Sequence, residues 1–77
     1  MNKKIFKECH IKTMGHCYVR QEPDFGSVII YMAHKNSIYT IVEQNGDWGK
    51  LKAGGWIYLP CTTKYKLPTK PSGIVVL

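Results

Sequence analysis

Short runs in which apolar and polar residues alternate make up most of the chain. Alternation over four to eight residues, with β-branched and aromatic side chains, predicts half-buried β-strands. The runs cover residues 9–13, 17–20, 28–32, 38–43, 48–51 and 56–59. Pro60 ends the last run, because proline cannot donate a hydrogen bond to a neighbouring strand. Since no window shows a helical period with caps, we expect a small all-β barrel or sandwich of about five or six short strands.

Residues 45–59 carry the strongest local signal, because tight-turn sequences alternate there with runs that begin with tryptophan. The turn sequences, residues 45–46 and 53–55, read Asn-Gly and Ala-Gly-Gly and are typical of β-hairpins. Side chains alternate across a strand, so one face is expected to line the core with Leu51, Ile57 and Leu59. The opposite face then collects Trp48, Lys50, Trp56 and Tyr58. We expect the functional surface to be that second face.

The 77 residues suffice for one domain with one core. Residues 1–8 are predicted to be a mobile basic lead-in, residues 9–66 the barrel, and residues 67–77 a linker-like tail. The apolar end of the tail, residues 74–77, either docks as a final strand or begins a further unit, and we favour docking.

Basic residues exceed acidic ones, with 11 Lys and Arg against 5 Asp and Glu and a net charge of +6. This balance indicates either a solvated basic surface or attraction to a polyanion such as nucleic acid, teichoic acid or a membrane surface. The lysines are scattered, and no RNA-binding aromatic motif, helix-turn-helix pattern or arginine-rich run accompanies them. Charge alone therefore does not establish nucleic-acid binding. No run has the length of a membrane span or of a signal peptide's apolar region, so we expect cytoplasmic synthesis, with action at the cell wall after release.

The three cysteines, Cys9, Cys17 and Cys61, have no paired metal-ligand spacing. His10 and His16 adjoin the first two and leave a Cys/His metal cluster open, but we expect reduced, partly buried thiols and no cofactor. A peptidase pair of Cys17 and His16 is disfavoured, because adjacent residues of a strand point to opposite faces. Since the sequence has no phosphate-binding loop, paired carboxylates or Ser/His/Asp set, we predict a binding module rather than an enzyme.

Three further sequence blocks follow one another along the chain. Residues 19–23 read Val-Arg-Gln-Glu-Pro, residues 28–31 and 39–42 form two apolar runs, and residues 46–57 contain Gly-Asp-Trp-Gly-Lys-Leu followed by Gly-Trp-Ile. In order and spacing they resemble the bacterial SH3-like (SH3b) family across roughly residues 9–65. The Trp-Gly-Lys and Gly-Trp-Ile version is most similar to cell-wall-binding modules of Gram-positive amidases and phage endolysins.

The resemblance implies a small SH3-like barrel of about five to seven short antiparallel strands. It also implies non-catalytic binding to peptidoglycan or an anionic wall polymer, which would target a lytic or wall-remodelling activity. Three positions depart from the family pattern. Cys17-Tyr18 stands where the family has Leu-Asn, Cys61 stands where it often has tyrosine, and Asp47 is an additional residue before Trp48.

The ligand-binding candidates combine aromatic rings with a few polar groups, as sites for sugar rings and short peptides do. They are Trp48, Trp56, Tyr58, Tyr18, Asp47, Asn45 and Arg20. Structural roles compete at several of them, since either tryptophan can plug an end of the barrel. Arg20 can instead form a salt bridge that pins the loop containing Glu22 and Asp24. Tyr31 and Tyr39 are expected in the core.

Two other functions stay open at this point. The first is a free-standing intracellular protein–protein interaction module of phage or mobile-element origin, which docks on a host protein through the same aromatic face. The second and weaker one is a nucleic-acid-binding β-barrel, because small barrels with a basic face and exposed rings often bind single strands.

Overall fold

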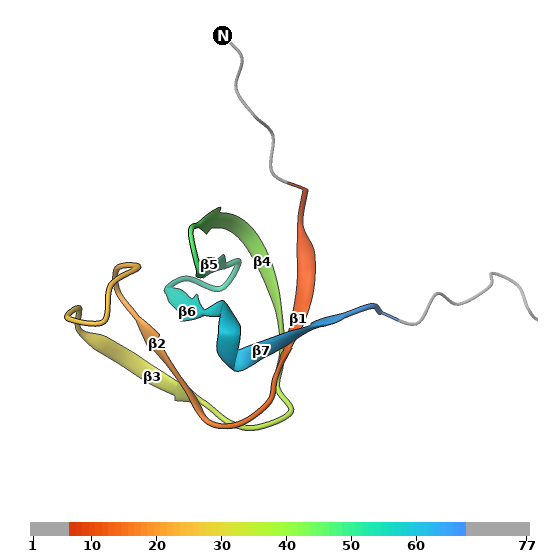
Figure 1. Ribbon diagram of the computed structural model, residues 1–77, viewed down its shortest axis with the longest axis horizontal. Helices are drawn as coiled ribbons and strands as arrows, with labels where there is room; N and C mark the ends of the chain where they lie inside the picture. The colour runs from red at the N-terminus through yellow and green to blue at the C-terminus, as the bar shows by residue number, and fades with distance from the viewer. Residues whose placement is uncertain (1–6, 68–77) are drawn as a thin grey trace, which may run out of the picture.

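The computed structural model describes residues 7–67, which form seven antiparallel β-strands and one short 3-10 turn (Figure 1). The elements are β1 (Cys9–Thr13), β2 (Cys17–Arg20), β3 (Ile29–Ala33), β4 (Ile38–Asn45), β5 (Trp48–Leu51), β6 (Trp56–Tyr58), η1 (Leu59–Cys61) and β7 (Thr62–Tyr65). The prediction of a small all-β fold made of short antiparallel strands is therefore confirmed. Among the described residues, no helix has the length and apolar character needed to cross a membrane.

The strands form one sheet in the order β3-β2-β6-β5-β4-β1-β7. The sheet curls, so that the β2–β3 hairpin lies on one side of the molecule and β1, β4 and β7 lie on the other, with β6 between them (Figure 1). The register between β4 and β5 shifts between Ile41 and Glu43, and β4 curves along its length (Figure 1). β3 and β7 end the order, so each has one hydrogen-bonded neighbour among the described strands.

Alternate residues of the strands point inward and form one apolar core. Its buried members are Ile11, Cys17, Val19, Ala33, Ile41, Leu51 and Ile57. Leu59 is half-buried and packs against this cluster. Gly49 lies among these residues on β5, where an added Cβ would be 2.8 Å from Leu59 Cδ2 and 3.0 Å from Ile41 Cδ1. The core therefore leaves no room for a side chain at Gly49.

Most strand bounds follow the alternation pattern to within two residues, and the largest difference lies after β6. β1, β2 and β5 have the predicted bounds, whereas β3 starts at Ile29 and β4 continues to Asn45. The strand expected at residues 56–59 ends at Tyr58, and η1 and β7, which the alternation pattern did not predict, follow it. Pro60 lies in the first turn of η1, where its missing N–H is not needed, and the Thr62 hydroxyl donates to the Leu59 carbonyl at 2.7 Å.

The two tyrosines expected in the core have different environments. Tyr39 is half-buried and packs against the core, as predicted. Tyr31 remains 38% exposed on β3, so its assignment to the core was wrong. Because β3 is an end strand, nothing among the described residues covers its outer side. The predicted docking segment, residues 74–77, lies outside the described residues.

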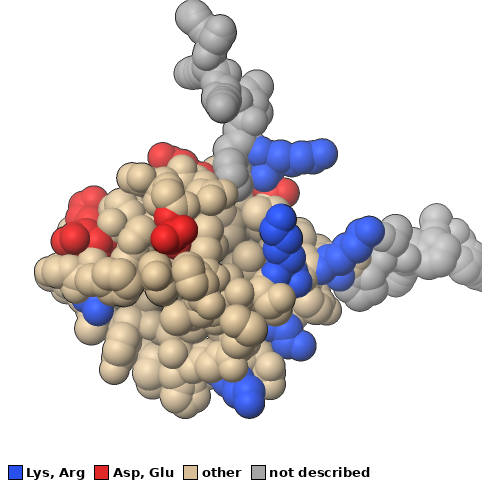
Figure 2. Space-filling view, viewed as in Figure 1, with Lys and Arg blue, Asp and Glu red and all other residues tan. Residues whose placement is uncertain are grey.

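Charge is unevenly distributed over the described surface. Figure 2 shows basic side chains beside β7 where it leaves the sheet, and acidic side chains towards the β2–β3 loop and the upper part of the view. The basic side includes Lys12 on β1 together with the exposed Lys64 and Lys66. The β2–β3 loop carries the exposed Glu22 and Asp24.

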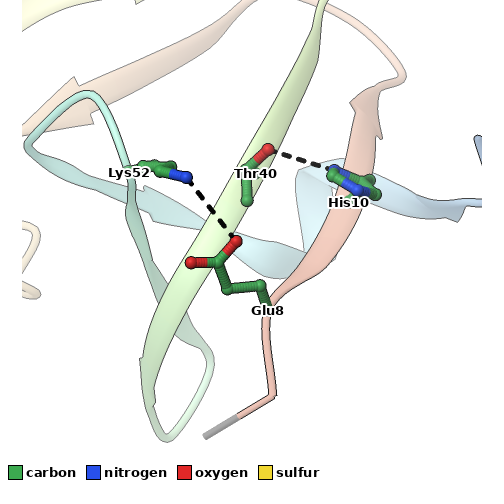
Figure 3. A network of polar contacts seen from close by, with 4 residues as sticks. All are labelled: Glu8, His10, Thr40 and Lys52. Atoms are coloured by element: carbon green, nitrogen blue, oxygen red, sulfur yellow. Dashed lines mark hydrogen bonds and ion pairs between the residues drawn. The ribbon is translucent and has the colours of Figure 1, made fainter.

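Polar side chains tie the start of β1 to its neighbours (Figure 3). The Glu8 carboxylate lies 3.8 Å from Lys52 Nζ, and His10 Nδ1 lies 3.0 Å from Thr40 Oγ1 on β4. Both side chains of the ion pair are exposed, so it contributes only ~0–1 kcal/mol to stability. Of the predicted lead-in, Glu8 is thus placed beside the β5–β6 loop, while residues 1–6 lie outside the described range.

Candidate functional site

The registers of β2, β6 and β5 bring the predicted aromatic residues onto one face of the sheet. Trp48 is opposite Tyr58, Lys50 is opposite Trp56, and Arg20 is opposite Trp56 from the other side. Residues directly opposite one another share a face. The reverse side of the same strands carries Val19 and Ile57, which are fully buried. We call the outer surface the aromatic face; it comprises Tyr18, Arg20, Phe25, Trp48, Lys50, Trp56 and Tyr58.

Two glycine turns fix these registers. In the β4–β5 hairpin, Asn45 pairs with Trp48, and the loop consists of Gly46 and Asp47, with Gly46 at φ 62°. A positive φ at the first loop residue favours glycine. In the β5–β6 loop, Gly54 and Gly55 have φ values of 107° and 91°. Both hairpins predicted from the turn sequences are therefore confirmed.

Three rings of the aromatic face pack into a triangle. Phe25 lies with its ring centroid 4.8 Å from those of both Trp48 and Tyr58, and the Trp48 and Tyr58 centroids are 5.3 Å apart. The interplanar angles of 55–64° are tilted or edge-to-face geometries, which aromatic pairs favour. Trp48 is only 8% exposed, whereas Phe25 is 59% exposed. Trp48 therefore forms the base of the cluster, and Phe25 presents its ring to solvent.

Phe25 was missing from the residues predicted from the sequence. It lies in the β2–β3 loop, which folds back over β5 and β6. Hydrogen bonds shape this loop: the Asp24 amide donates to the Glu22 carbonyl at 2.7 Å, and the Glu22 amide donates to Ser27 Oγ at 2.9 Å. A large aromatic residue within a polar, turn-rich loop was the available signal.

Arg20 holds the same loop, but not through the salt bridge considered from the sequence. Its guanidinium donates to the Ser27 carbonyl at 2.8 Å and lies 5.8 Å from the Phe25 ring centroid. No ion pair within 4.0 Å joins Arg20 to Glu22 or Asp24. A carbonyl and a ring therefore replace the expected carboxylate, and the positive charge stays at the rim of the aromatic cluster.

The remaining predicted residues surround the triangle at different depths. Trp56 is half-buried, with Lys50 Nζ 6.0 Å from its ring centroid. Asn45 and Asp47 are exposed at the end of the β4–β5 hairpin, next to Trp48. Tyr18 is 53% exposed, and its cross-strand partner on β3 is Met32. All seven predicted residues thus lie on this face or at its edge.

The buried thiol of Cys17 lies on the opposite, core side of the sheet. Its Sγ donates to the Cys61 carbonyl at 3.4 Å and to the Gly15 carbonyl at 3.5 Å. Burial, followed by the neighbouring Cys61, raises the pKa of Cys17 to about 11. The thiol is therefore protonated at neutral pH, whereas a nucleophilic cysteine requires a lowered pKa. Cys9, Cys17 and Cys61 are all free, and within residues 7–67 no three His, Cys, Asp or Glu side chains are grouped as metal ligands.

A hollow of about 300 Å³ opens between β1, β4 and η1, away from the aromatic face. Ile11, Ile41 and Leu59 form its apolar wall, with Cys9 and Lys64 at the sides. Its lining contains no aromatic ring and none of the predicted site residues. The aromatic face therefore remains the candidate site.

Comparisons of the chain with protein-family models, with curated proteins and with solved structures found no match.

Proposed function

We propose that this protein is a non-catalytic, SH3b-like module that binds bacterial cell-wall peptidoglycan through its aromatic face. The observation that carries the proposal is the Phe25–Trp48–Tyr58 triangle, in which a buried tryptophan supports an exposed ring beside the Arg20 guanidinium. The order of the sequence blocks that resemble the SH3b family supports the same assignment. In this proposal the buried Cys17, whose pKa is raised, is a core residue and not a nucleophile.

Each part of the face has a role in this proposal. Phe25, Tyr58 and Trp56 offer ring surfaces on which the apolar side of a sugar or a peptide methyl group packs. Asn45 and Asp47 offer an amide and a carboxylate at the hairpin end for hydroxyl and amide groups of the ligand. Trp48, already enclosed by its neighbours, supports the other rings and does not stack on the ligand itself.

The distribution of charge favours a wall polymer over nucleic acid at this face. Single-strand binders combine stacking rings and a positively charged groove in one place. The aromatic face does carry Arg20 and Lys50, but acidic residues lie in the loops beside it (Glu22, Asp24 and Asp47). The exposed lysines Lys64 and Lys66, together with Lys12, lie on and after β1 and β7, at the other end of the sheet order from β2 and β6. In the proposal these lysines attract anionic wall polymers, while the aromatic face binds peptidoglycan.

The test is sedimentation of the purified protein with Gram-positive sacculi before and after removal of teichoic acid. Phe25→Ala is the informative variant, because Phe25 is exposed and its loss leaves the core intact. We expect binding to stripped sacculi to fall between about twofold and tenfold, the range for one aromatic contact. Met14→Ala is the matched control, since Met14 is 54% exposed and lies outside the face. Equal binding by the wild type and Phe25→Ala, or no sedimentation with any sacculus, would refute the proposal.

The second candidate is an intracellular protein-interaction module that uses the same face. The free state of Cys9, Cys17 and Cys61 favours it, because unpaired thiols suit a reducing compartment. Failure to bind any sacculus, combined with Phe25-dependent binding to a purified host protein, would establish this function in place of the first. Steeply salt-dependent binding to single-stranded nucleic acid would instead support nucleic-acid binding.

A further inference from the structure

The β3 edge is the most apolar exposed part of the described molecule. Five consecutive large side chains on and before β3 are exposed, by 38–65%. They are Val28, Ile29, Ile30, Tyr31 and Met32. β3 pairs only with β2, so the backbone groups on its outer side have no partner strand among residues 7–67. An edge strand of this kind is a template for pairing with another strand.

The opposite edge of the sheet is protected in a way that β3 is not. β7 has the sequence Thr-Thr-Lys-Tyr. Its exposed Lys64 disfavours pairing with a further strand, because a strand added there would enclose the lysine charge. Residues 28–33 contain no charged residue and no proline. Of the two end strands, β3 alone therefore presents an uninterrupted apolar edge.

Opposite charges lie at the two ends of β3. The loop before it carries Glu22 and Asp24, and no ion pair within 4.0 Å involves either carboxylate in the described part of the chain. Lys35, exposed, follows the other end. The loop is held near the strand start, because the Gln21 amide donates to the Val28 carbonyl at 2.9 Å. A strand pairing antiparallel with β3 would thus match its own acidic end to Lys35.

We propose that two copies of this chain form a two-fold symmetric dimer by antiparallel pairing of their β3 strands. Centring the axis on Tyr31, the middle residue of β3, places Lys35 of each copy opposite Ser27 of the other. The Ser27 amide donates to the Asp24 carbonyl at 3.0 Å, and its hydroxyl accepts from the Glu22 amide at 2.9 Å. In this arrangement Lys35 lies beside the loop that carries both acidic residues, and the symmetry repeats this opposition of charge at the other end.

The second copy provides the interaction partners that the β3 edge lacks. It supplies partners for the outward backbone groups of β3, apolar contacts for its side chains, and complementary charge at both ends. Specific complexes bury about 1,000 Å² or more in total, and the five partly exposed large side chains of each copy supply apolar surface towards that area.

The dimer has a consequence for binding that rests on the function proposed above. The two-fold axis of an antiparallel strand pair is perpendicular to the sheet, so both aromatic faces lie on the same side. A repetitive polymer could then engage both copies, which raises the overall affinity without any new contact.

The primary test is the mass of the full-length protein in solution as a function of concentration. We expect a shift from one chain to two, with β3 amides that exchange more slowly in the dimer than in the monomer. Ile29→Lys should weaken dimerisation by about tenfold or more, because it places a charge at the interface. Ile38→Lys is the matched control, since Ile29 and Ile38 are 45% and 44% exposed and Ile38 lies on β4. Circular dichroism checks that both variants fold.

A charge exchange tests the antiparallel arrangement itself. Lys35→Glu should weaken the dimer, and combining it with Asp24→Lys should restore it, because each contact then regains opposite charges. A protein that stays monomeric at every soluble concentration would overturn the proposal, as would a dimer insensitive to Ile29→Lys. A third result would also overturn it: a monomer whose β3 amides are protected from hydrogen exchange and lose that protection in Val75→Lys. The apolar tail, and not a second copy, would then pair with the β3 edge. Failure of wall binding would leave the dimer itself untouched.

Discussion

At the scale of single residues, Gly55 is the point where the β5–β6 hairpin meets the core. Its φ is 91°, and an added Cβ would lie 2.5 Å from Val19 Cγ1 and 3.4 Å from the Arg20 carbonyl oxygen. Gly46 also has a positive φ, 62°, but a Cβ added there would meet no other atom within 4 Å. Comparing alanine substitutions at the two glycines therefore separates the cost of a positive φ from the cost of a steric clash.

We expect Gly55→Ala to lower the free energy of unfolding by roughly 3 kcal/mol, because it adds overpacking to an unfavourable positive φ. Gly46→Ala should cost only about 1 kcal/mol, which is the conformational part alone. Urea unfolding of both variants measures the difference. Equal losses would mean that the contact with Val19 does not constrain this position.

Cys17 should make stability depend on pH in alkaline solution. Its pKa in the folded protein is raised from 9.0 to about 11, so between these values the folded state binds more protons than the unfolded state. The stabilisation from the protonated thiol is then complete below pH 9 and is lost as the pH rises to 11. Unfolding in urea across this pH range should show a shallower decline in Cys17→Ala than in the wild type.

The exposed Cys9 provides the control for this experiment. Cys9→Ala removes an exposed thiol and so controls for the loss of a cysteine outside the core. A thiol-reactive dye should also modify Cys9 well before Cys17 in the native protein. Rapid modification of Cys17 at neutral pH would contradict the buried, protonated thiol.

At the scale of elements, the β2–β3 loop depends on Arg20. Arg20→Met keeps much of the apolar stem and removes the hydrogen bond to the Ser27 carbonyl, so we expect a loss of about 1 kcal/mol in stability. Phe25 should then cover Trp48 less completely. Acrylamide quenching of Trp48 fluorescence should increase, measured in a Trp56→Phe background so that one tryptophan reports. Unchanged quenching would show that the loop is held without Arg20.

The strands could be predicted because each carries its own alternation, and the two hairpins because glycine is required at their turns. β7 could not, since Thr62–Tyr65 is a mostly polar edge whose place is set by pairing with β1. The burial of Trp48 was only one of two alternatives that the sequence left open. It results from Phe25, a residue far away in the sequence, folding over it, and no local pattern records such a contact. The sequence therefore predicts which residues share the aromatic face, but not how deeply each side chain is buried.

At the scale of the whole molecule, the basic side lies apart from the aromatic face, which has only Arg20 and Lys50 as its own cations. The aromatic face is formed around β2, β6 and β5, and the lysines of the basic side lie on and after β1 and β7 (Figure 2). If both regions contribute to wall binding, their contributions should differ in how they depend on salt concentration and on which wall polymer is present. Interactions of exposed charges are screened over about 10 Å at 0.1 M salt, whereas ring contacts are nearly insensitive to salt.

Replacing Lys64 and Lys66 together by glutamine should therefore weaken binding to intact sacculi at low salt and leave binding to teichoic-acid-free sacculi nearly unchanged. Phe25→Ala should weaken both, because peptidoglycan is present in each. Lys52→Gln removes one exposed charge outside the basic side and serves as the control. Sedimentation over a range of salt concentrations measures the effect. If the double lysine variant and Phe25→Ala lose binding to stripped sacculi equally, a single surface binds the wall and the division between the two regions is wrong.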